Sequence, residues 1–296
     1  MSRISKKYHF FSLAIITVIA ILVCILYLFL FFLHSNLTQI SYTTLHFDKN
    51  KEKLFLNGNL LWDTGADASV IYEEHKDKIL NRIRIGNVSV IDYFYKKRFV
   101  PFYYSSQFTI SDSVNIRNFF FSTIKDVPER TKQNYEIGLI GMDVISKANW
   151  TIDFDSEKVD ITPHNKIYKT EKQPHLILKY KRRKTPKTQL NFAVCKLENI
   201  LIDAGFNCDI TLLKSDIEAI NRKYKPIDTL TFSPSGLHSV SDGIMNSYIY
   251  STIQINNICF SNVEIAEGCR RLIGFKFFKR FNKVFLNTKE KEFCFY

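Results

Sequence analysis

Two segments of the chain align on each other without a gap: Leu61-Trp62-Asp63-Thr64-Gly65-Ala66-Asp67-Ala68-Ser69-Val70-Ile71 and Leu201-Ile202-Asp203-Ala204-Gly205-Phe206-Asn207-Cys208-Asp209-Ile210-Thr211. In both, a short apolar run meets Asp-x-Gly and is followed by a further extended run. This pattern predicts a buried strand, a tight loop that carries a carboxylate, and a second strand. A repeat of this kind indicates that one structural unit occurs twice in the chain.

A second pair of segments follows the first pair at a similar spacing: Ile137-Gly138-Leu139-Ile140-Gly141-Met142-Asp143-Val144-Ile145 and Arg271-Leu272-Ile273-Gly274-Phe275-Lys276-Phe277-Phe278. Each is followed by an amphipathic turn, an asparagine and a predicted hairpin, at residues 150–161 and 283–295. Because order, spacing and flanking pattern agree, we expect an N-terminal lobe at residues 40–162 and a C-terminal lobe at residues 175–296. The polar residues 163–174 follow neither the helix nor the strand period and are predicted to link them.

Alternating β-branched and aromatic residues predict that strands dominate both lobes. A hairpin is expected across residues 88–102, with an aromatic tip at residues 92–97. Short helices are predicted near residues 73–80, 142–147, 214–223 and 275–280. The fold class predicted from these patterns is all-β.

Asp63-Thr64-Gly65-Ala66 behind an apolar strand, followed by Ile140-Gly141 and a short helix, resembles a lobe of a retropepsin-like aspartic protease. Two such lobes in one chain resemble the pepsin arrangement. The resemblance covers about residues 40–296, and its second copy is degenerate. It implies a bilobal acid-protease-type fold, in which two pseudo-symmetric β-barrel lobes face each other across a cleft under a β-hairpin flap.

The resemblance further implies an aspartic endopeptidase whose catalytic residues are Asp63 and Asp203. In that chemistry one carboxylate activates a water and the other protonates the peptide carbonyl. Two carboxyls that lie together cannot both ionise easily, so the pair shares a proton and titrates as a unit. No metal and no organic cofactor is implied. The partner is a peptide or protein substrate, and the catalytic domain is expected to be monomeric.

The residues around the two aspartates are expected to support the loops. Gly65 and Gly205 let the loops approach each other, with Ala66 beside the first. By resemblance, the hydroxyl of Thr64 bonds across to the opposite loop, whereas Ala204 has no hydroxyl to return that bond, which removes about 0.5–1.5 kcal/mol of local bracing. Phe206, in place of Ala66, makes the two sides of the cleft unequal.

At the tip of the predicted hairpin, Tyr93 and Phe94 either contact substrate as a flap or serve as aromatic cover for the core. Two alternatives to the protease itself stay open. Ala204 favours a catalytically weak or inactive pseudo-protease that binds peptides or acts as a scaffold. The second alternative is a homodimer in which the first lobes of two chains form the site and the second lobe serves as a support.

The segment that begins at Phe10 and ends at Leu33 contains no charged residue. As a helix it spans about 36 Å, which is enough to cross a bilayer core of about 30 Å. A cleavable signal peptide has a shorter apolar region and a small-residue cleavage site, so a permanent anchor is favoured. Arg3, Lys6 and Lys7 precede it, which predicts a cytoplasmic stub at residues 1–9 and an extracytoplasmic (periplasmic or extracellular) catalytic domain.

The net charge of +12 raises the question of nucleic-acid binding. The densest basic run, residues 179–184, is more often a solvated loop or a site of attraction to anionic lipids, so no nucleic-acid partner is predicted. The chain has no G-x-S-x-G elbow, no H-x-x-x-H pair and no phosphate-binding G-x-x-x-x-G-K-[ST] loop. Of its six cysteines, five lie in the second lobe and are expected to pack in the core or to form one or two disulfides.

Overall fold

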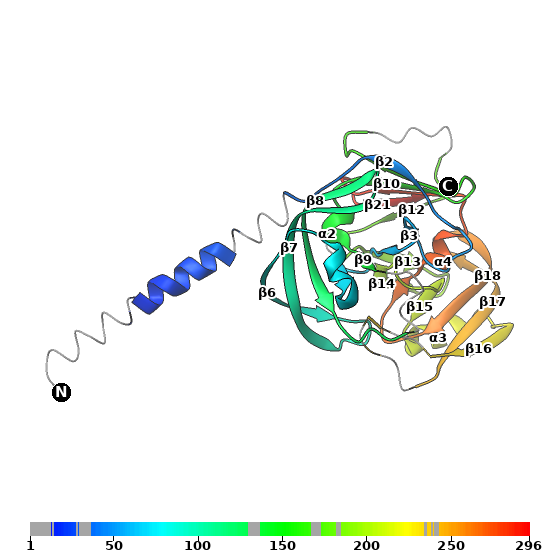
Figure 1. Ribbon diagram of the computed structural model, residues 1–296. Coiled ribbons are helices and arrows are strands. Elements are labelled where there is room, and N and C mark those ends of the chain that lie inside the picture. Colours follow the sequence, from blue (N-terminus) through cyan, green and yellow to red (C-terminus); the bar gives the residue numbers. More distant parts are fainter. Residues whose placement is uncertain are drawn as a thin grey trace, which may run out of the picture.

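The computed structural model describes residues 13, 15–27, 29, 37–129, 137–166, 173–181, 185–233, 236–237, 239 and 243–296. Of the predicted membrane anchor, residues 13, 15–27 and 29 are therefore described, and all of them are helical (Figure 1). Within the described residues, no helix combines the length and the apolar character that crossing a membrane requires, so the predicted transmembrane helix is not found there. Residues 10–12, 14, 28 and 30–33 of the predicted anchor lie outside the described part.

The first lobe is built on one sheet with the strand order β3-β4-β9-β5-β8-β7-β6, to which β1 is added beside β8. At its centre, β4 and β9 are parallel, β9 and β5 are antiparallel, and β5 and β8 are parallel again. The strands of this sheet are β1 (Gln39–Ile40), β3 (Phe55–Leu56), β4 (Leu60–Trp62), β5 (Val70–Tyr72), β6 (Arg82–Ile91), β7 (Lys97–Ser111), β8 (Val114–Ile124) and β9 (Gly138–Ile140).

The second lobe repeats this topology strand for strand, in the order β13-β14-β19-β15-β18-β17-β16. Its central pairs have the same directions: β14 and β19 parallel, β19 and β15 antiparallel, β15 and β18 parallel. Its strands are β13 (Lys187–Asn191), β14 (Lys196–Ile202), β15 (Ile210–Leu212), β16 (Asp228–Phe232), β17 (Met245–Ile255), β18 (Ile258–Glu267) and β19 (Leu272–Ile273). The internal repeat read from the sequence is thus a repeat of the fold.

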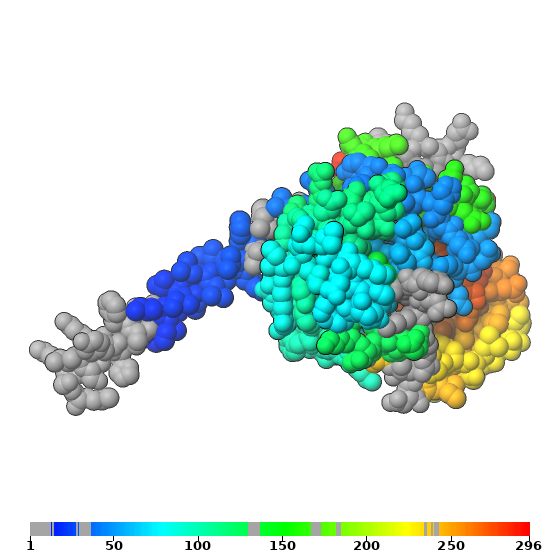
Figure 2. All heavy atoms as spheres, in the orientation of Figure 1, coloured from blue at the N-terminus to red at the C-terminus, as the bar shows by residue number. Residues whose placement is uncertain are grey.

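A third sheet joins the lobes, in the order β12-β21-β20-β10-β11-β2. It contains the two predicted hairpins, and at its centre β10 pairs with β20 in an antiparallel register that sets Trp150 opposite Leu286. Figure 2 shows the blue part of the first lobe lying against the yellow and orange second lobe. The strands are β2 (Thr43–His46), β10 (Asn149–Asp153), β11 (Lys158–Thr162), β12 (Leu176–Lys179), β20 (Lys283–Asn287) and β21 (Glu292–Phe295).

The three sheets are open in the described part of the chain, because none of the strand orders returns to its first strand. The expectation that each lobe forms a β-barrel was therefore wrong. Among the residues that the structure describes, the outer strands β6 and β16 pair only with β7 and β17, respectively, and do not close onto β3 or β13. The broader prediction of an all-β, two-lobed fold is confirmed.

Short helices occur where the sequence predicted them. A 3-10 helix, η1 (Glu73–Lys78), follows β5, and α3 (Lys214–Asn221) follows β15. The helices α2 (Met142–Ile145) and α4 (Phe275–Phe278) follow Gly141 and Gly274 directly, one in each lobe. All six cysteines belong to the described residues, and all six are free thiols.

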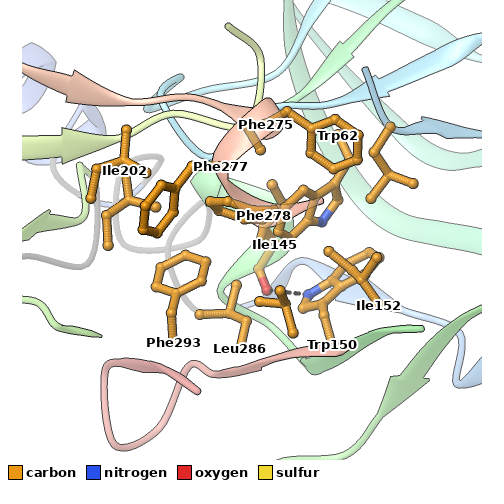
Figure 3. Close-up of a cluster of buried hydrophobic side chains, with 14 of the residues drawn as sticks. Trp62, Ile145, Trp150, Ile152, Ile202, Phe275, Phe277, Phe278, Leu286 and Phe293 are labelled. Atoms are coloured by element: carbon orange, nitrogen blue, oxygen red, sulfur yellow. Dashed lines mark hydrogen bonds between the residues drawn. The ribbon is translucent and has the colours of Figure 1, made fainter. Parts of the chain in front are cut away.

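The core lies between the third sheet and the two loops that follow β4 and β14 (Figure 3). Trp62 and Trp150 pack with ring centroids 5.8 Å apart, and the indole N–H of Trp150 donates to the carbonyl of Ile145 at 2.8 Å. From the second lobe, Phe278 packs against Phe293 and Phe295. One continuous apolar cluster therefore underlies both repeated loops and fixes them relative to each other.

Candidate active site

Asp63 and Asp203 occupy equivalent places, one residue beyond the ends of β4 and β14. The backbone N–H of Asp63 donates to the carbonyl of Ile140 at 3.1 Å, and that of Asp203 donates to the carbonyl of Ile273 at 2.8 Å. Each aspartate loop is thus anchored to the parallel strand beside it, β9 or β19. The pairing brings the carboxyls to the junction of the two lobes.

The two carboxyls face each other and share a hydrogen bond. Asp63 Oδ1 also accepts from the backbone N–H groups of Gly65 at 2.8 Å and Ala66 at 3.1 Å. Asp203 Oδ1 accepts from the N–H of Gly205 at 3.0 Å. The structure therefore brings together the two aspartates that the sequence predicted as a pair, although 140 positions separate them in the chain.

Glycine is required at both loops because each lies against the opposite carboxyl. A Cβ on Gly65 would lie 2.2 Å from Asp203 Cγ, and a Cβ on Gly205 would lie 2.5 Å from Asp63 Cγ. Real Cβ atoms do not approach other heavy atoms so closely. The close approach that the sequence predicted for these glycines is confirmed.

Gly141 and Gly274 allow a strand to pass directly beneath each aspartate loop. A Cβ on Gly141 would lie 2.8 Å from the carbonyl oxygen of Ala66, and one on Gly274 would lie 2.3 Å from that of Cys208. The backbone N–H of Gly141 also donates to the hydroxyl oxygen of Ser69 at 3.2 Å, which ties the strand to the loop. Side chains at either glycine would push the loop out of place.

Burial raises the pKa of both carboxyls. For Asp203 the negative charge of Asp63 adds to burial, so its pKa lies well above the ordinary value of 3.8. For Asp63 burial also dominates, and the N–H of Gly65 and the bond with Asp203 offset it only in part. The positive charge of Lys53 lowers the pKa of both. Such a pair retains a proton at a pH at which isolated aspartates are ionised.

Thr64 braces the loops across the lobe junction. Its buried hydroxyl donates to the carbonyl of Ile202 at 2.8 Å and accepts from the backbone N–H of Ala204 at 3.0 Å. Ala204 is equally buried, but its methyl group cannot make the reciprocal bond. The structure therefore contains the one-sided brace that the sequence predicted.

A cavity of about 530 Å³ opens above the carboxyl pair and is lined by both lobes. The first lobe contributes Lys53, Leu61 and Tyr72 to its wall, and the second contributes Leu201 and Phe206. Both carboxyls remain partly exposed toward this space. A water and an extended chain segment can therefore reach them from one side.

The tip of the β6–β7 hairpin covers the cavity and rests on the second lobe. Tyr93 is 9% exposed and stacks on Phe206 with ring centroids 5.0 Å apart, while Phe94 packs edge-on against Tyr93. Arg270 from the second lobe donates to the backbone carbonyl of Asp92, and its guanidinium lies 3.9 Å from the centroid of the Tyr95 ring. Tyr93 thus lines the cavity and is also packed, and Phe94 packs against Tyr93. Contact of either side chain with a substrate stays a prediction.

The loop between β16 and β17 also reaches the tip of the β6–β7 hairpin. Ser239, in the loop between β16 and β17, donates to the carboxylate of Asp92, whose other oxygen accepts from the N–H groups of Phe94 and Lys96 at 3.0 Å. Cys269 Sγ donates to the carbonyl of Tyr93 at 3.2 Å. Burial, with the neighbouring thiols of Cys269 and Cys208, raises the pKa of the Tyr93 hydroxyl.

Sequence reasoning missed Lys53, Arg270 and Ser239. Each belongs to a segment without a motif. Arg270 and Ser239 reach the site through contacts between the lobes, and Lys53 reaches it because Leu54 bonds to the end of β4. In the part of the chain that the structure describes, no three His, Cys, Asp or Glu side chains gather in a way that could hold a metal ion.

Comparison with known proteins gives a fold but no sequence relative. No family model matches the chain, and no curated protein matches it in sequence. The crystal structure of basic 7S globulin from soybean is similar over 87% of this chain and 94% of its own, with a TM-score of 0.51 and 8% identity. That similarity concerns the fold alone and supports an acid-protease-like fold. A retropepsin-like aspartic protease from Rickettsia conorii aligns over 44% of this chain and 96% of its own, with a TM-score of 0.30 and 18% identity.

Proposed function

We propose that this protein is an aspartic endopeptidase in which Asp63 and Asp203 together activate a water molecule. The observation that carries the proposal is the pair of hydrogen-bonded carboxyls at the floor of a two-lobed cavity. Raised pKa values in a cleft mark groups that are matched to proton transfer. Buried pairs that serve only stability are usually a cation with an anion, not two acids.

The reaction follows from the shared proton. The ionised carboxyl takes a proton from water as the water oxygen attacks the peptide carbonyl carbon, and the other carboxyl gives its proton to the carbonyl oxygen. The tetrahedral intermediate then collapses: the C–N bond breaks, the leaving nitrogen receives a proton from the pair, and one hydroxyl of the intermediate returns its proton to the pair as the C=O bond re-forms. One carboxyl and one amine are released, and the pair again holds one proton. General acid and base steps of this kind each contribute about 10²–10⁴-fold.

The cavity fits an extended peptide. Its two walls come from equivalent strands of the two lobes, and the hairpin tip roofs the space between them. A substrate held in this way is bound by its backbone, and side-chain pockets set the specificity. Phe206, stacked on Tyr93, makes the wall of the second lobe bulkier than that of the first.

The test is cleavage of a peptide library by the full chain between pH 3 and pH 8. We expect Asp63→Asn and Asp203→Asn each to lower kcat by at least about 10²–10⁴-fold, while circular dichroism shows a folded protein. Asp155→Asn is the matched control, because Asp155 is exposed in the β10–β11 turn, and it should cleave like the parent. Parental activity in the Asp203→Asn variant would refute the pair.

One observation favours a second candidate, a pseudo-protease that binds peptides without cutting them. The brace between the loops is one-sided, because Ala204 lacks a hydroxyl. Under the proposed function, Ala204→Thr keeps both carboxyls and cleaves at least as fast as the parent. Under the second candidate, the parent binds library peptides and releases no product at any pH.

A further inference from the structure

One cation, Lys53, lines the same cavity as the two carboxyls. It precedes the fully buried Leu54, whose carbonyl accepts from the N–H of Trp62 at 2.9 Å. That bond lays the segment along β4, one residue before Asp63. The charge of Lys53 acts on both carboxyls.

The other charged groups of the cavity wall are already engaged or are exposed. Asp92 accepts from Ser239 and from the tip backbone, and Glu264 accepts from Lys276 and from Ser247. Arg270 holds the hairpin tip. Glu52, next to Lys53, is exposed.

Lys53 differs from these groups. Among the described residues, no side chain or carbonyl forms a hydrogen bond or ion pair with its ammonium, although the residue is partly buried. Lys51, two positions earlier, donates to the carbonyl of Gly58 and lies over the ring of Phe55. A partly buried ammonium gains most from an anion that arrives with the ligand, because a charge-assisted bond is stronger away from bulk water.

The pseudo-symmetry confines this cation to one side of the cleft. In the second lobe the N–H of Ile202 donates to the carbonyl of Pro186 at 2.8 Å, as Trp62 does to Leu54. The residue equivalent to Lys53 is therefore Thr185, which is neutral. A bound peptide thus meets the Lys53 ammonium in the wall of the first lobe, and the equivalent position of the second lobe offers no cation.

We infer that Lys53 is a specificity-determining residue, which selects peptides carrying an aspartate or glutamate on one side of the bond that is cut. This inference rests on the proposed function and names its substrate class. The carboxylate of the peptide pairs with the Lys53 ammonium within the cavity. A charge-assisted bond of this kind corresponds to roughly a 10- to 100-fold preference in kcat/KM.

The experiment uses the full chain and pairs of peptides that differ only by Glu or Gln, with the change moved through each position on both sides of the cut. The parent should prefer Glu by roughly 10- to 100-fold, at positions on one side only. Lys53→Met should bring that ratio close to one, Lys53→Arg should keep it, and Lys51→Met, the matched control, should leave it unchanged.

A second readout separates a role beside the carboxyls from a merely structural one. Because the Lys53 charge lowers the pKa of Asp63 and Asp203, Lys53→Met should move both limbs of the pH profile to higher pH, and Lys53→Arg should restore them. A parent that cleaves Glu and Gln peptides equally, or a Lys53→Met variant that keeps the preference, would overturn the inference. A parent that cleaves nothing refutes the proposed function instead, and its relative binding of Glu and Gln peptides then decides the role of Lys53.

Discussion

At the scale of single residues, the two carboxyls of the site are not equivalent. Asp63 accepts two backbone N–H groups, whereas Asp203 accepts one and also feels the charge of its partner. The ionised form of Asp203 is stabilised by fewer hydrogen-bond donors than that of Asp63. The free-energy cost of ionisation is therefore greater at Asp203. Asp203, which the proposed reaction requires, therefore destabilises the folded protein when it is ionised.

That cost predicts a pH-dependent gain in stability for Asp203→Asn. The folded-state pKa of Asp203 lies above the ordinary value of 3.8, so its ionisation destabilises the fold above the folded pKa. The effect fades as the pH falls through the folded pKa and vanishes below the unfolded value. At pH 7 we therefore expect the variant to have a larger free energy of unfolding and a higher Tm than the parent, and at pH 3 we expect the difference to be much smaller.

Thermal unfolding of the full chain at pH 7 and at pH 3 measures this difference. Asp155→Asn, at an exposed position, should change the free energy of unfolding by less than about 0.5 kcal/mol at either pH. A variant that is destabilised at pH 7, or a gain that persists unchanged at pH 3, would contradict the prediction.

Much of the residue-scale site could be predicted from the sequence, because a local motif encodes it. Asp63, Thr64 and Gly65 are recognisable together, and the repeat locates Asp203 by alignment. Lys53 could not be found in this way. Its segment has no motif, and it lies beside the carboxyls only because Leu54 bonds to the strand that precedes Asp63.

At the scale of elements, the β6–β7 hairpin joins the lobes over the cavity. The hairpin itself could be predicted, because aromatic and β-branched residues flank its tip. The sequence predicted a tip at residues 92–97, and the structure has five residues, 92–96, between Ile91 and Lys97. Its partners could not be predicted. Arg270, Phe206 and Ser239 come from three separate loops of the other lobe, and only the tertiary fold brings them to the tip.

Arg270 contacts the hairpin tip twice, at the carbonyl of Asp92 and over the ring of Tyr95, which predicts that Arg270→Met loosens the tip. A cation–π contact is worth about 0.5–2 kcal/mol, so amide hydrogen exchange at residues 92–97 should become roughly 2- to 30-fold faster. Arg222→Met, at the end of α3, serves as the control and should leave this exchange unchanged. Equal exchange in the parent and in Arg270→Met would show that the tip is held by its aromatic contacts alone.

At the scale of the whole molecule, the two lobes share one interior. A single apolar cluster includes Trp62 of the first lobe, Trp150 of the third sheet and Phe278 of the second lobe (Figure 3). The third sheet adds continuous hydrogen bonds between the lobes through β10 and β20. The repeat in the sequence predicted two similar units but did not reveal this sheet, because pairing between distant strands leaves no local pattern.

A shared interior predicts that the lobes unfold together. Phe278→Ala should cost about 3–5 kcal/mol, and hydrogen exchange should show the same loss of stability for β8 in the first lobe and β18 in the second. Phe99→Ala, at a side chain that is 73% exposed, is the control and should cost little. A loss confined to β18 would mean that the lobes are independent units.

The pairing of β10 with β20 also sets the order of events during synthesis. Trp150 is translated 136 residues before its partner Leu286, a delay of about 7–27 s at the usual rates of elongation. Throughout that interval the nascent first lobe presents an unpaired strand edge, the feature through which polypeptides associate wrongly. Asp203 is likewise translated 140 residues after Asp63, so the carboxyl pair cannot form on the ribosome until the second lobe has emerged.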